Sequence, residues 1–343
     1  MLRSDAAAIT RLPACDYANE DVADASARGE LRPRVGSGRC GTTDVDMLVF
    51  LHNQKAGGTT VKGALIELCR ACESWVCWFP DGPLASLRRW TEALVPSSLR
   101  GAGYIDRWFA LPQHARNATR VLFGDRDQTI AACHFVDTRC VYAINVREPL
   151  SQMISHYNYF CVDGAEGQHK WSDAQRAQGY CDAGFERWSV GAIPLVPRLS
   201  GLRSFANRSV MQAACRVAVS NVLHPCMWAM LVDDFASLIG VFGRKLGAPW
   251  SAKLLGTLKA KNTNAGLHPR RRRHLGASQS LEDGKHLPRA RRIQKAMLVP
   301  IRLAAMRERW ARSAVLNTTF IIHEKVARAS TKARWERRPL LTC

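Results

Sequence analysis

The sequence predicts an α/β protein with a central parallel sheet flanked by helices, and three observations predict it. Short apolar runs at 48–51, 120–124 and 140–146 have the composition of buried strands. Segments whose apolar residues fall at helical spacing follow the first and the last of these runs. Strands that alternate with helices form parallel sheets, because the chain must cross over before it adds the next parallel strand.

The first apolar run ends in a loop that suits a bound phosphate. The loop consists of Lys55, Ala56, Gly57, Gly58, Thr59 and Thr60. Glycine allows the backbone to approach a ligand closely, and the unpaired N–H groups at the start of the next helix favour an anion. The lysine adds a positive charge, and the threonines add hydroxyl donors. Because the lysine precedes the glycines, the order differs from the GxxxxGKS or GxxxxGKT loop and argues against a nucleoside triphosphatase.

The third apolar run ends in a second motif. Arg147 stands at the carboxyl end of the predicted strand, and Pro149 lies in the first turn of the predicted helix, where its missing N–H costs nothing. Ser155 follows Arg147 by eight positions, about two helical turns. In a parallel sheet the carboxyl ends of the strands share one edge, where ligands bind, so we expect Lys55, Asp125 and Arg147 to meet there.

Together the two motifs resemble those of sulfotransferases that use 3′-phosphoadenosine 5′-phosphosulfate (PAPS). The second motif looks most like that of the heparan sulfate and uronyl 2-O-sulfotransferases, strand–R–D–P–x–x–R–x–x–S–x–Y, with Glu148 in place of Asp and Gln152 in place of the second Arg. The resemblance covers roughly residues 46–250 and implies a P-loop-like sulfotransferase fold.

The resemblance also implies an activity, the transfer of a sulfuryl group from PAPS to a hydroxyl of a glycan. A glycosaminoglycan-like polysaccharide with 2-O transfer is the favoured acceptor. Lys55 would stabilise the leaving oxygen, and the backbone of Ala56 to Thr60 would cradle the 5′-phosphate. Arg147 and Ser155 would hold the 3′-phosphate, and the reaction needs no metal.

The general base is the residue that departs from the family pattern. The resembled enzymes place a His directly after the middle strand, whereas this chain has Gly124 followed by Asp125. Asp125 is one candidate, and His134 or His114 from a neighbouring loop is another. The alternative function is a sulfotransferase-like protein that binds a nucleotide or polyanion without catalysis.

Charge and composition divide the chain into three predicted parts. Residues 1–45 form a poorly ordered leader, 46–260 the sulfotransferase domain, and 261–343 a basic tail that is partly helical or disordered. From Arg270 onward there are 19 Lys and Arg against 5 Asp and Glu, so this tail carries most of the net charge of +20. We expect an acidic polysaccharide as partner or a solvated tail, and we do not favour nucleic acid, because no recognisable DNA or RNA module is present.

Within the predicted domain, residues 163–200 read as loops over the acceptor cleft. Helices are predicted at 210–223 and 233–247, and a strand near Met227.

Twelve cysteines fit an oxidising compartment. We expect disulfides, with Cys161–Cys181 and Cys215–Cys226 as candidate pairs, and disfavour a zinc site at Cys69, Cys72 and Cys77 because a second matching pair is missing. Glycosylation sequons begin at the following asparagines: Asn117, Asn207 and Asn317.

The N-terminal region has no signal-peptide pattern, and no apolar run is long enough to span a bilayer. Glycan sulfotransferases of the resembled family are normally Golgi type II membrane proteins. The resemblance therefore implies the Golgi lumen or membrane, with membrane association through an N-terminal anchor missing from this sequence.

Overall fold

The computed structural model describes residues 45–72, 75–80, 82–83, 102–125, 127–157, 185, 195–202, 208–224, 226–232 and 313–335. Six strands form one sheet: β1 (Met47–Leu51), β2 (Val76–Phe79), β3 (Gly82–Pro83), β4 (Thr119–Gly124), β5 (Cys140–Val146) and β6 (Met227–Leu231). Their order is β3-β2-β4-β1-β5-β6. Strands β2, β4, β1, β5 and β6 are parallel, and β3 pairs with β2 in antiparallel fashion. The predicted α/β class with a central parallel sheet is therefore confirmed.

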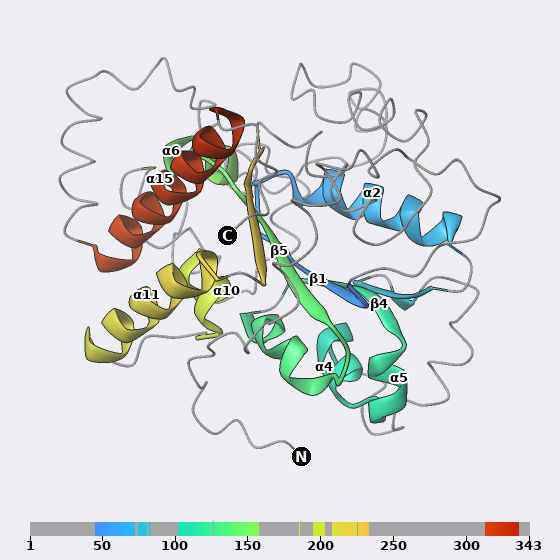
Figure 1. Cartoon of the computed structure of the whole chain (residues 1–343). Helices are drawn as coiled ribbons and strands as arrows, with labels where there is room; N and C mark the ends of the chain where they lie inside the picture. Colours follow the sequence, from blue (N-terminus) through green and yellow to red (C-terminus); the bar gives the residue numbers. More distant parts are fainter. Residues whose placement is uncertain are drawn as a thin grey trace, which may run out of the picture.

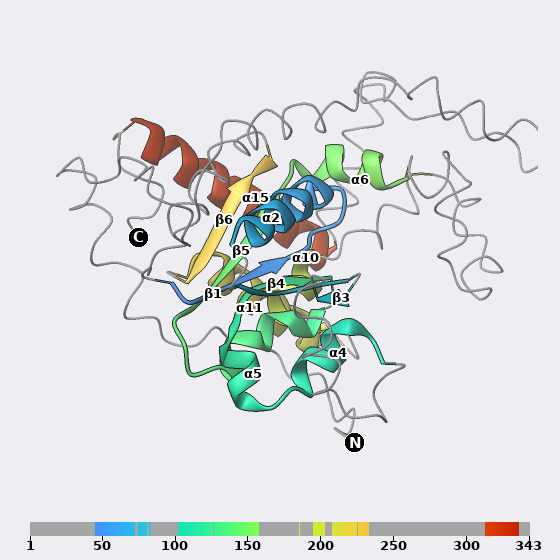
Figure 2. The ribbon, with the colours of Figure 1, turned by 90° about the vertical axis from the view of Figure 1, so that its right-hand side faces the viewer.

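Helices cover both faces of this sheet (Figures 1 and 2). The helices are α2 (Gly58–Ala71), α4 (Tyr104–Phe109), α5 (Gln113–Asn117), α6 (Pro149–Tyr157), α10 (Leu195–Ser200), α11 (Arg208–Val222), α15 (Ala314–Trp335) and the 3-10 helix η2 (Asp127–Phe135). Helix α2 lies on one face, and α4, α10 and α11 lie on the other (Figure 1).

Strand β1 illustrates why the core strands are apolar throughout. Leu48 and Phe50 are fully buried against α2, whereas Met47, Val49 and Leu51 are fully buried in the core on the opposite face. Because successive side chains of a strand point to opposite faces, a strand covered on both sides reads as a continuous apolar run.

The three predicted strands are present as β1, β4 and β5, but the sequence reading missed β2. Its four residues, Val76–Phe79, are all buried, yet the segment is too short to show a period. Trp78 lies in this strand and donates an indole hydrogen bond to the carbonyl oxygen of Tyr104 at 2.7 Å, which connects β2 to α4.

Part of the predicted basic tail belongs to the core. Helix α15 packs against α11 and β6, and Leu316, Ile322 and Val326 are buried there. The helix predicted at 210–223 is confirmed as α11, and the strand predicted near Met227 is confirmed as β6. Residues 195–200 form the buried helix α10 instead of a loop, which corrects that part of the prediction. The leader and the helix predicted at 233–247 lie outside the described residues.

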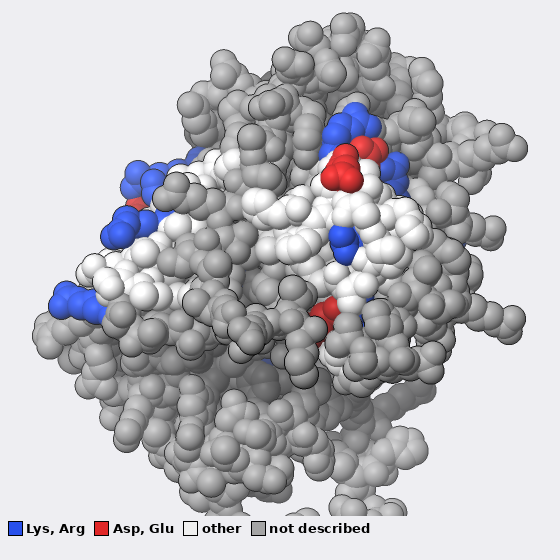
Figure 3. Space-filling model, turned by 90° about the horizontal axis from the view of Figure 1, so that it is seen from below, with Lys and Arg blue, Asp and Glu red and all other residues white. Residues whose placement is uncertain are grey.

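Seen from below, the described residues present mainly uncharged side chains, with Lys, Arg, Asp and Glu side chains at separated points among and beside them (Figure 3). Within the described ranges, no helix is both long and apolar enough to cross a membrane.

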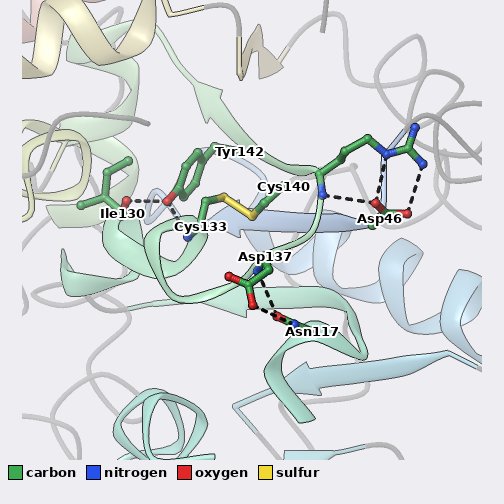
Figure 4. Close-up of a disulfide and its surroundings, with 8 residues drawn as sticks. Asp46, Asn117, Ile130, Cys133, Asp137, Cys140 and Tyr142 are labelled. Atoms are coloured by element: carbon green, nitrogen blue, oxygen red, sulfur yellow. Dashed lines mark hydrogen bonds and ion pairs between the residues drawn. A yellow bond between two sulfur atoms is a disulfide. The ribbon is translucent and has the colours of Figure 1, made fainter. Parts of the chain in front are cut away.

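The expectation of disulfides is confirmed by Cys69–Cys77 and Cys133–Cys140. Figure 4 shows the second bond beside Tyr142, whose hydroxyl donates to the carbonyl oxygen of Ile130 and accepts the N–H of Cys133. The Cys133–Cys140 bond and the two hydrogen bonds of Tyr142 hold the turn between η2 and β5.

Other cysteine predictions have mixed outcomes. The expected Cys215–Cys226 pair is wrong, because Cys215 is free and Cys226 is bonded elsewhere. Cys72 is disulfide-bonded too, so the three cysteines of the disfavoured zinc site carry no free thiolate. The Cys161–Cys181 pair lies outside the described residues.

Candidate active site

Strand order brings the two sequence motifs together. Strand β1 lies between β4 and β5, with Leu51 level with Gly124 on one side and Ile144 on the other. The loop after β1, Asp125 after β4 and the end of β5 therefore meet at the carboxyl edge of the sheet. Direct contact supports this, because Nη1 of Arg147 donates to the carbonyl oxygen of Lys55 at 2.9 Å.

The loop between β1 and α2 has two residues in the left-handed region. Lys55 has φ 59° and Gly57 has φ 76°, and Gly57 is the residue that precedes the first turn of α2. Glycine adopts this conformation freely, whereas a residue with a Cβ does so only at an energetic cost. Something around Lys55 must therefore hold its backbone in place.

Three consecutive carbonyl groups of the loop are bonded by side chains of β5, α6 and the turn between them. Nε2 of Gln152 donates to the carbonyl oxygen of Gln54 at 2.6 Å. Arg147 takes the next carbonyl, that of Lys55, and Nδ2 of Asn145 takes that of Ala56 at 3.1 Å. In a trans peptide the N–H points away from the preceding C=O, so these bonds turn the N–H groups of residues 55–57 away from β5 and α6. The N–H of Ala56 donates to the carbonyl oxygen of Asn53 at 3.3 Å, within the same loop.

Beneath the loop lies a buried network of amide side chains. Asn53 and Asn145 have no exposed surface, and Gln152 is 2% exposed. Nδ2 of Asn53 donates to the carbonyl oxygen of Asn145 at 3.0 Å, and Nε2 of Gln152 donates to Oδ1 of Asn53 at 2.8 Å. The network therefore joins the loop to both β5 and α6.

His156 of α6 extends this network. Its Nε2 lies 2.9 Å from Oε1 of Gln54. An amide oxygen only accepts, so Nε2 carries the proton. Burial, together with the charge of Lys55, lowers the pKa of His156 to about 3, which keeps the ring neutral at physiological pH.

His52, the first residue after β1, was missed by the sequence reading. Its ring packs against Phe123 with centroids 5.2 Å apart, and it lies against the start of α2. Burial, then the positive charge of Arg198, lowers its pKa to about 4; Asp125 opposes this shift, and Lys62 and Lys55 add to it. A His directly between a strand and the Lys55 loop was the signal available in the sequence.

The two loop glycines serve different purposes. Gly57 is required by its positive φ. A Cβ on Gly58 would lie 2.0 Å from Cδ2 of His52, so Gly58 is required by the packing of that ring and not only by close approach of a ligand. Thr60 is buried at 7% exposure and Thr59 is exposed, so the two predicted hydroxyl donors differ in environment.

Asp125 lies at the predicted edge, directly after β4. Its backbone N–H donates to the hydroxyl of Tyr104 at 2.8 Å, and that hydroxyl donates to the carbonyl oxygen of Phe123 at 2.7 Å. Burial and the carboxylate of Asp125 raise the pKa of Tyr104, so the phenol stays protonated. Gly124 is required because a Cβ there would lie 2.0 Å from Cγ2 of Thr129.

The two histidines predicted as alternative bases are not brought to this edge. His134 is exposed near the end of η2, next to Cys133, whose disulfide partner Cys140 begins β5. His114 lies in α5, which directly precedes β4. Both therefore lie toward the amino end of the sheet, and the structure does not bring His134 or His114 together with Lys55.

Helix α6 begins as predicted at Pro149. The carboxylate of Glu148 accepts the N–H groups of Leu150 and Ser151 at 3.1 and 2.8 Å. It therefore caps the helix, so the carboxylate that replaces the Asp of the resembled motif bonds the first turn of α6. Ser155 is half-buried in the second turn of α6, on the helix that Arg147 precedes.

The arrangement can bind an anion and transfer a proton. Backbone amides at the start of α2, the ammonium group of Lys55 and the guanidinium group of Arg147 supply positive potential, and a carboxylate and a neutral imidazole lie beside them. Comparison with models of protein families finds no match, and no curated protein matches the chain.

Proposed function

We propose that this protein is a PAPS-dependent carbohydrate O-sulfotransferase with a P-loop-like sulfotransferase fold. The observation that carries the proposal is the Lys55 loop, whose three carbonyl groups are bonded by Gln152, Arg147 and Asn145. These bonds turn the N–H groups of Lys55 and Gly57 away from β5 and α6. The Lys-before-Gly order and the Arg147 motif resemble those of sulfotransferases, and in the structure the two motifs touch.

In this proposal the loop binds the donor. The amides of Gly57, Gly58 and Thr59 would bind the 5′-phosphate at the positive end of the α2 dipole, with the exposed Thr59 hydroxyl as a further donor. The N–H groups of Ala56 and Thr60, at the two ends of this stretch, already donate to the carbonyl oxygens of Asn53 and Gly57. Arg147 and Ser155 would bind the 3′-phosphate, because a guanidinium group and a hydroxyl are both suited to phosphate oxygens. The residues fit the two phosphates chemically, because every group assigned to a phosphate is a hydrogen-bond donor.

The chain's residues would then favour in-line transfer. As the acceptor oxygen bonds to sulfur and the bond from sulfur to the 5′-phosphate oxygen breaks, Lys55 would neutralise the charge that develops on that leaving oxygen. Asp125 is the group at this edge assigned to take the acceptor's proton.

The acceptor is proposed to be an acidic, glycosaminoglycan-like polysaccharide, with 2-O transfer favoured. The net charge of +20 favours a polyanion. The disulfides fit an oxidising compartment, which supports a proposed location in the Golgi lumen or membrane with an N-terminal anchor.

The test is transfer of labelled sulfate from PAPS to a panel of desulfated polysaccharides. We expect transfer by the native protein and a loss of about 100-fold or more for Lys55→Ala. Arg70→Ala is the matched control, because it removes one positive charge at the exposed far end of the same helix. Absence of transfer to every acceptor, or equal rates for Lys55→Ala and the native protein, would overturn the catalytic proposal.

A second candidate is a non-catalytic protein that binds the nucleotide or a polyanion. The observation that favours it is Asp125, which stands where the resembled enzymes have a His, while His134 lies at the other end of the sheet. Calorimetry with 3′-phosphoadenosine 5′-phosphate separates the two: binding without turnover favours this candidate, and no binding excludes both the enzyme and a nucleotide-binding role.

A further inference from the structure

We infer that Asn145 and Gln152 are positioning residues, whose function is to set the backbone of the Lys55 loop for the 5′-phosphate. The inference rests on the proposed function, because that function supplies the ligand. Neither residue is assigned a contact with the donor; both act through carbonyl groups of the loop.

The first argument is the conformation that the loop must keep. Lys55 has a positive φ although it carries a Cβ, and Gly57 follows with another positive φ. A non-glycine residue stays in this region only where its surroundings hold it. The side-chain bonds to the carbonyls before and after Lys55 come from Gln152 and Asn145, and Arg147 bonds the carbonyl of Lys55 itself.

The second argument is that these amides are poor choices for packing alone. Both side chains are nearly or completely buried, at 2% exposure for Gln152 and 0% for Asn145. Oε1 of Gln152 and Oδ1 of Asn145 have no hydrogen-bond partner in the described part of the chain. Burying an acceptor in this state is costly, so apolar residues would fill the same space more favourably. The donors of the two amides, which bond the loop, offset that cost.

The third argument is that Gln152 joins two parts of the loop. Its Nε2 is within bonding distance of both Oδ1 of Asn53 and the carbonyl oxygen of Gln54. Asn53 in turn donates to the carbonyl oxygen of Asn145 on β5. Removal of Gln152 therefore releases the start of the loop, and removal of Asn145 releases its end.

The test compares two ligands that differ in one phosphate, adenosine 3′,5′-bisphosphate and adenosine 3′-phosphate, by calorimetry on the full chain. The variants are Gln152→Met and Asn145→Ala. We expect each variant to bind the bisphosphate about tenfold more weakly and the 3′-phosphate with unchanged affinity, because one or two lost hydrogen bonds correspond to about a tenfold change. The ratio between the affinities for the bisphosphate and the 3′-phosphate, which measures the gain from the 5′-phosphate, would therefore be smaller in each variant.

Tyr142→Phe is the matched control. Tyr142 lies on the same strand as Asn145 and is fully buried, but its hydroxyl bonds Ile130 and Cys133 near the other end of β5. We expect this variant to lose thermal stability while keeping the full gain from the 5′-phosphate. If Asn145→Ala does not fold, Gln152→Met decides the test.

Two results would overturn this inference without affecting the proposed function. In the first, the variants gain as much affinity from the 5′-phosphate as the native protein does. In the second, the variants bind both ligands more weakly by the same factor, as a merely structural role predicts. If the native protein binds neither ligand, or gains nothing from the 5′-phosphate, the proposed function falls and the inference falls with it.

Discussion

At the scale of single residues, Lys55 shows how a strained backbone is kept in a folded protein. The left-handed conformation costs a residue with a Cβ about 1–2 kcal/mol. One net hydrogen bond contributes about 0.5–1.5 kcal/mol. Three bonds to the carbonyls of Gln54, Lys55 and Ala56 are therefore enough to offset the strain.

Two histidines with lowered pKa values, His52 and His156, make the stability of the protein depend on pH. The folded-state pKa of His156 is about 3 and that of His52 about 4, both below the ordinary value of 6.5. At a pH between each folded-state pKa and 6.5, the unfolded chain binds a proton on that ring and the folded chain does not. The stabilising contribution of each ring is therefore complete above pH 6.5 and falls as the pH falls. We expect each ring to remove about 1.4 kcal/mol per pH unit.

Urea unfolding at pH 7, 6 and 5 measures this loss. His156→Gln keeps a polar side chain but does not titrate, so we expect the part of the pH dependence due to His156 to disappear. The charged groups that act on His52, namely Arg198, Asp125, Lys62 and Lys55, remain in this variant. An unchanged slope in His156→Gln would show that the ring is protonated in the folded state.

Gly58→Ala is expected to destabilise the protein, although alanine is normally the better helix residue. The new Cβ would lie 2.0 Å from Cδ2 of His52, and relief of such overlap costs about 1–3 kcal/mol. Gly63→Ala, in the interior of the same helix, should instead stabilise by about 0.4–1 kcal/mol. Chemical denaturation measures the change in the free energy of unfolding for both variants. Two changes of the same sign would contradict the packing of His52 against Gly58.

At the scale of elements, α15 has the clearest structural role among the residues beyond 260. Its buried apolar side chains contact α11 and β6, and Thr318 and Thr319 donate to helix carbonyls one turn earlier at 2.7 and 3.0 Å. These hydroxyls are thereby satisfied inside a buried face. A helix that carries charge on one side and apolar residues on the other is easily read as a basic tail.

Ile322→Ala tests this packing. Ile322 is fully buried in the main core, so its truncation should lower the free energy of unfolding by about 2–5 kcal/mol. Asn317→Ala, at an exposed position of the same helix, should stay within about 0.5 kcal/mol of the native protein. Equal effects in the two variants would mean that α15 does not contribute to the core.

At the scale of the whole molecule, disulfides connect the layers of the fold. Cys69–Cys77 joins α2 to β2, and Cys133–Cys140 joins η2 to β5. Each closes a short loop. Next to Cys140, Arg139 forms an ion pair with Asp46 at 3.0 Å, and Figure 4 shows Asp46 near the Cys133–Cys140 bond. In the sheet, β2 and β5 flank the pair β4 and β1, so a disulfide attaches a helix to the strand on each side of this pair.

Reduction should lower the stability of the whole fold. Closing loops of this length contributes roughly 2.5 kcal/mol each through the unfolded state. Thermal unfolding with and without a reductant measures the total effect, and a Cys133→Ser, Cys140→Ser double variant isolates one bond. A melting temperature that reductant leaves unchanged would contradict this role.

The sequence by itself determined the local elements and their order. Apolar runs predicted β1, β4 and β5, helical spacing predicted α2 and α11, and Pro149 marked the start of α6. Two short motifs located the edge at which Lys55, Asp125 and Arg147 meet, because parallel strands end at the same edge. These features depend on periodicity and on turn residues, which are local properties of the chain.

Only the tertiary structure decided what surrounds the Lys55 loop. Strand order brought Asn145 and Gln152 under the loop and set His52 beside Asp125, and the opposite position of His134 followed from the direction of β5. It also placed α15 in the core and left Cys215 without the expected partner. The bonds of Asn145 and Gln152 to the loop join residues 89 and 99 positions apart. No local pattern specifies such contacts, because they depend on which strands lie side by side.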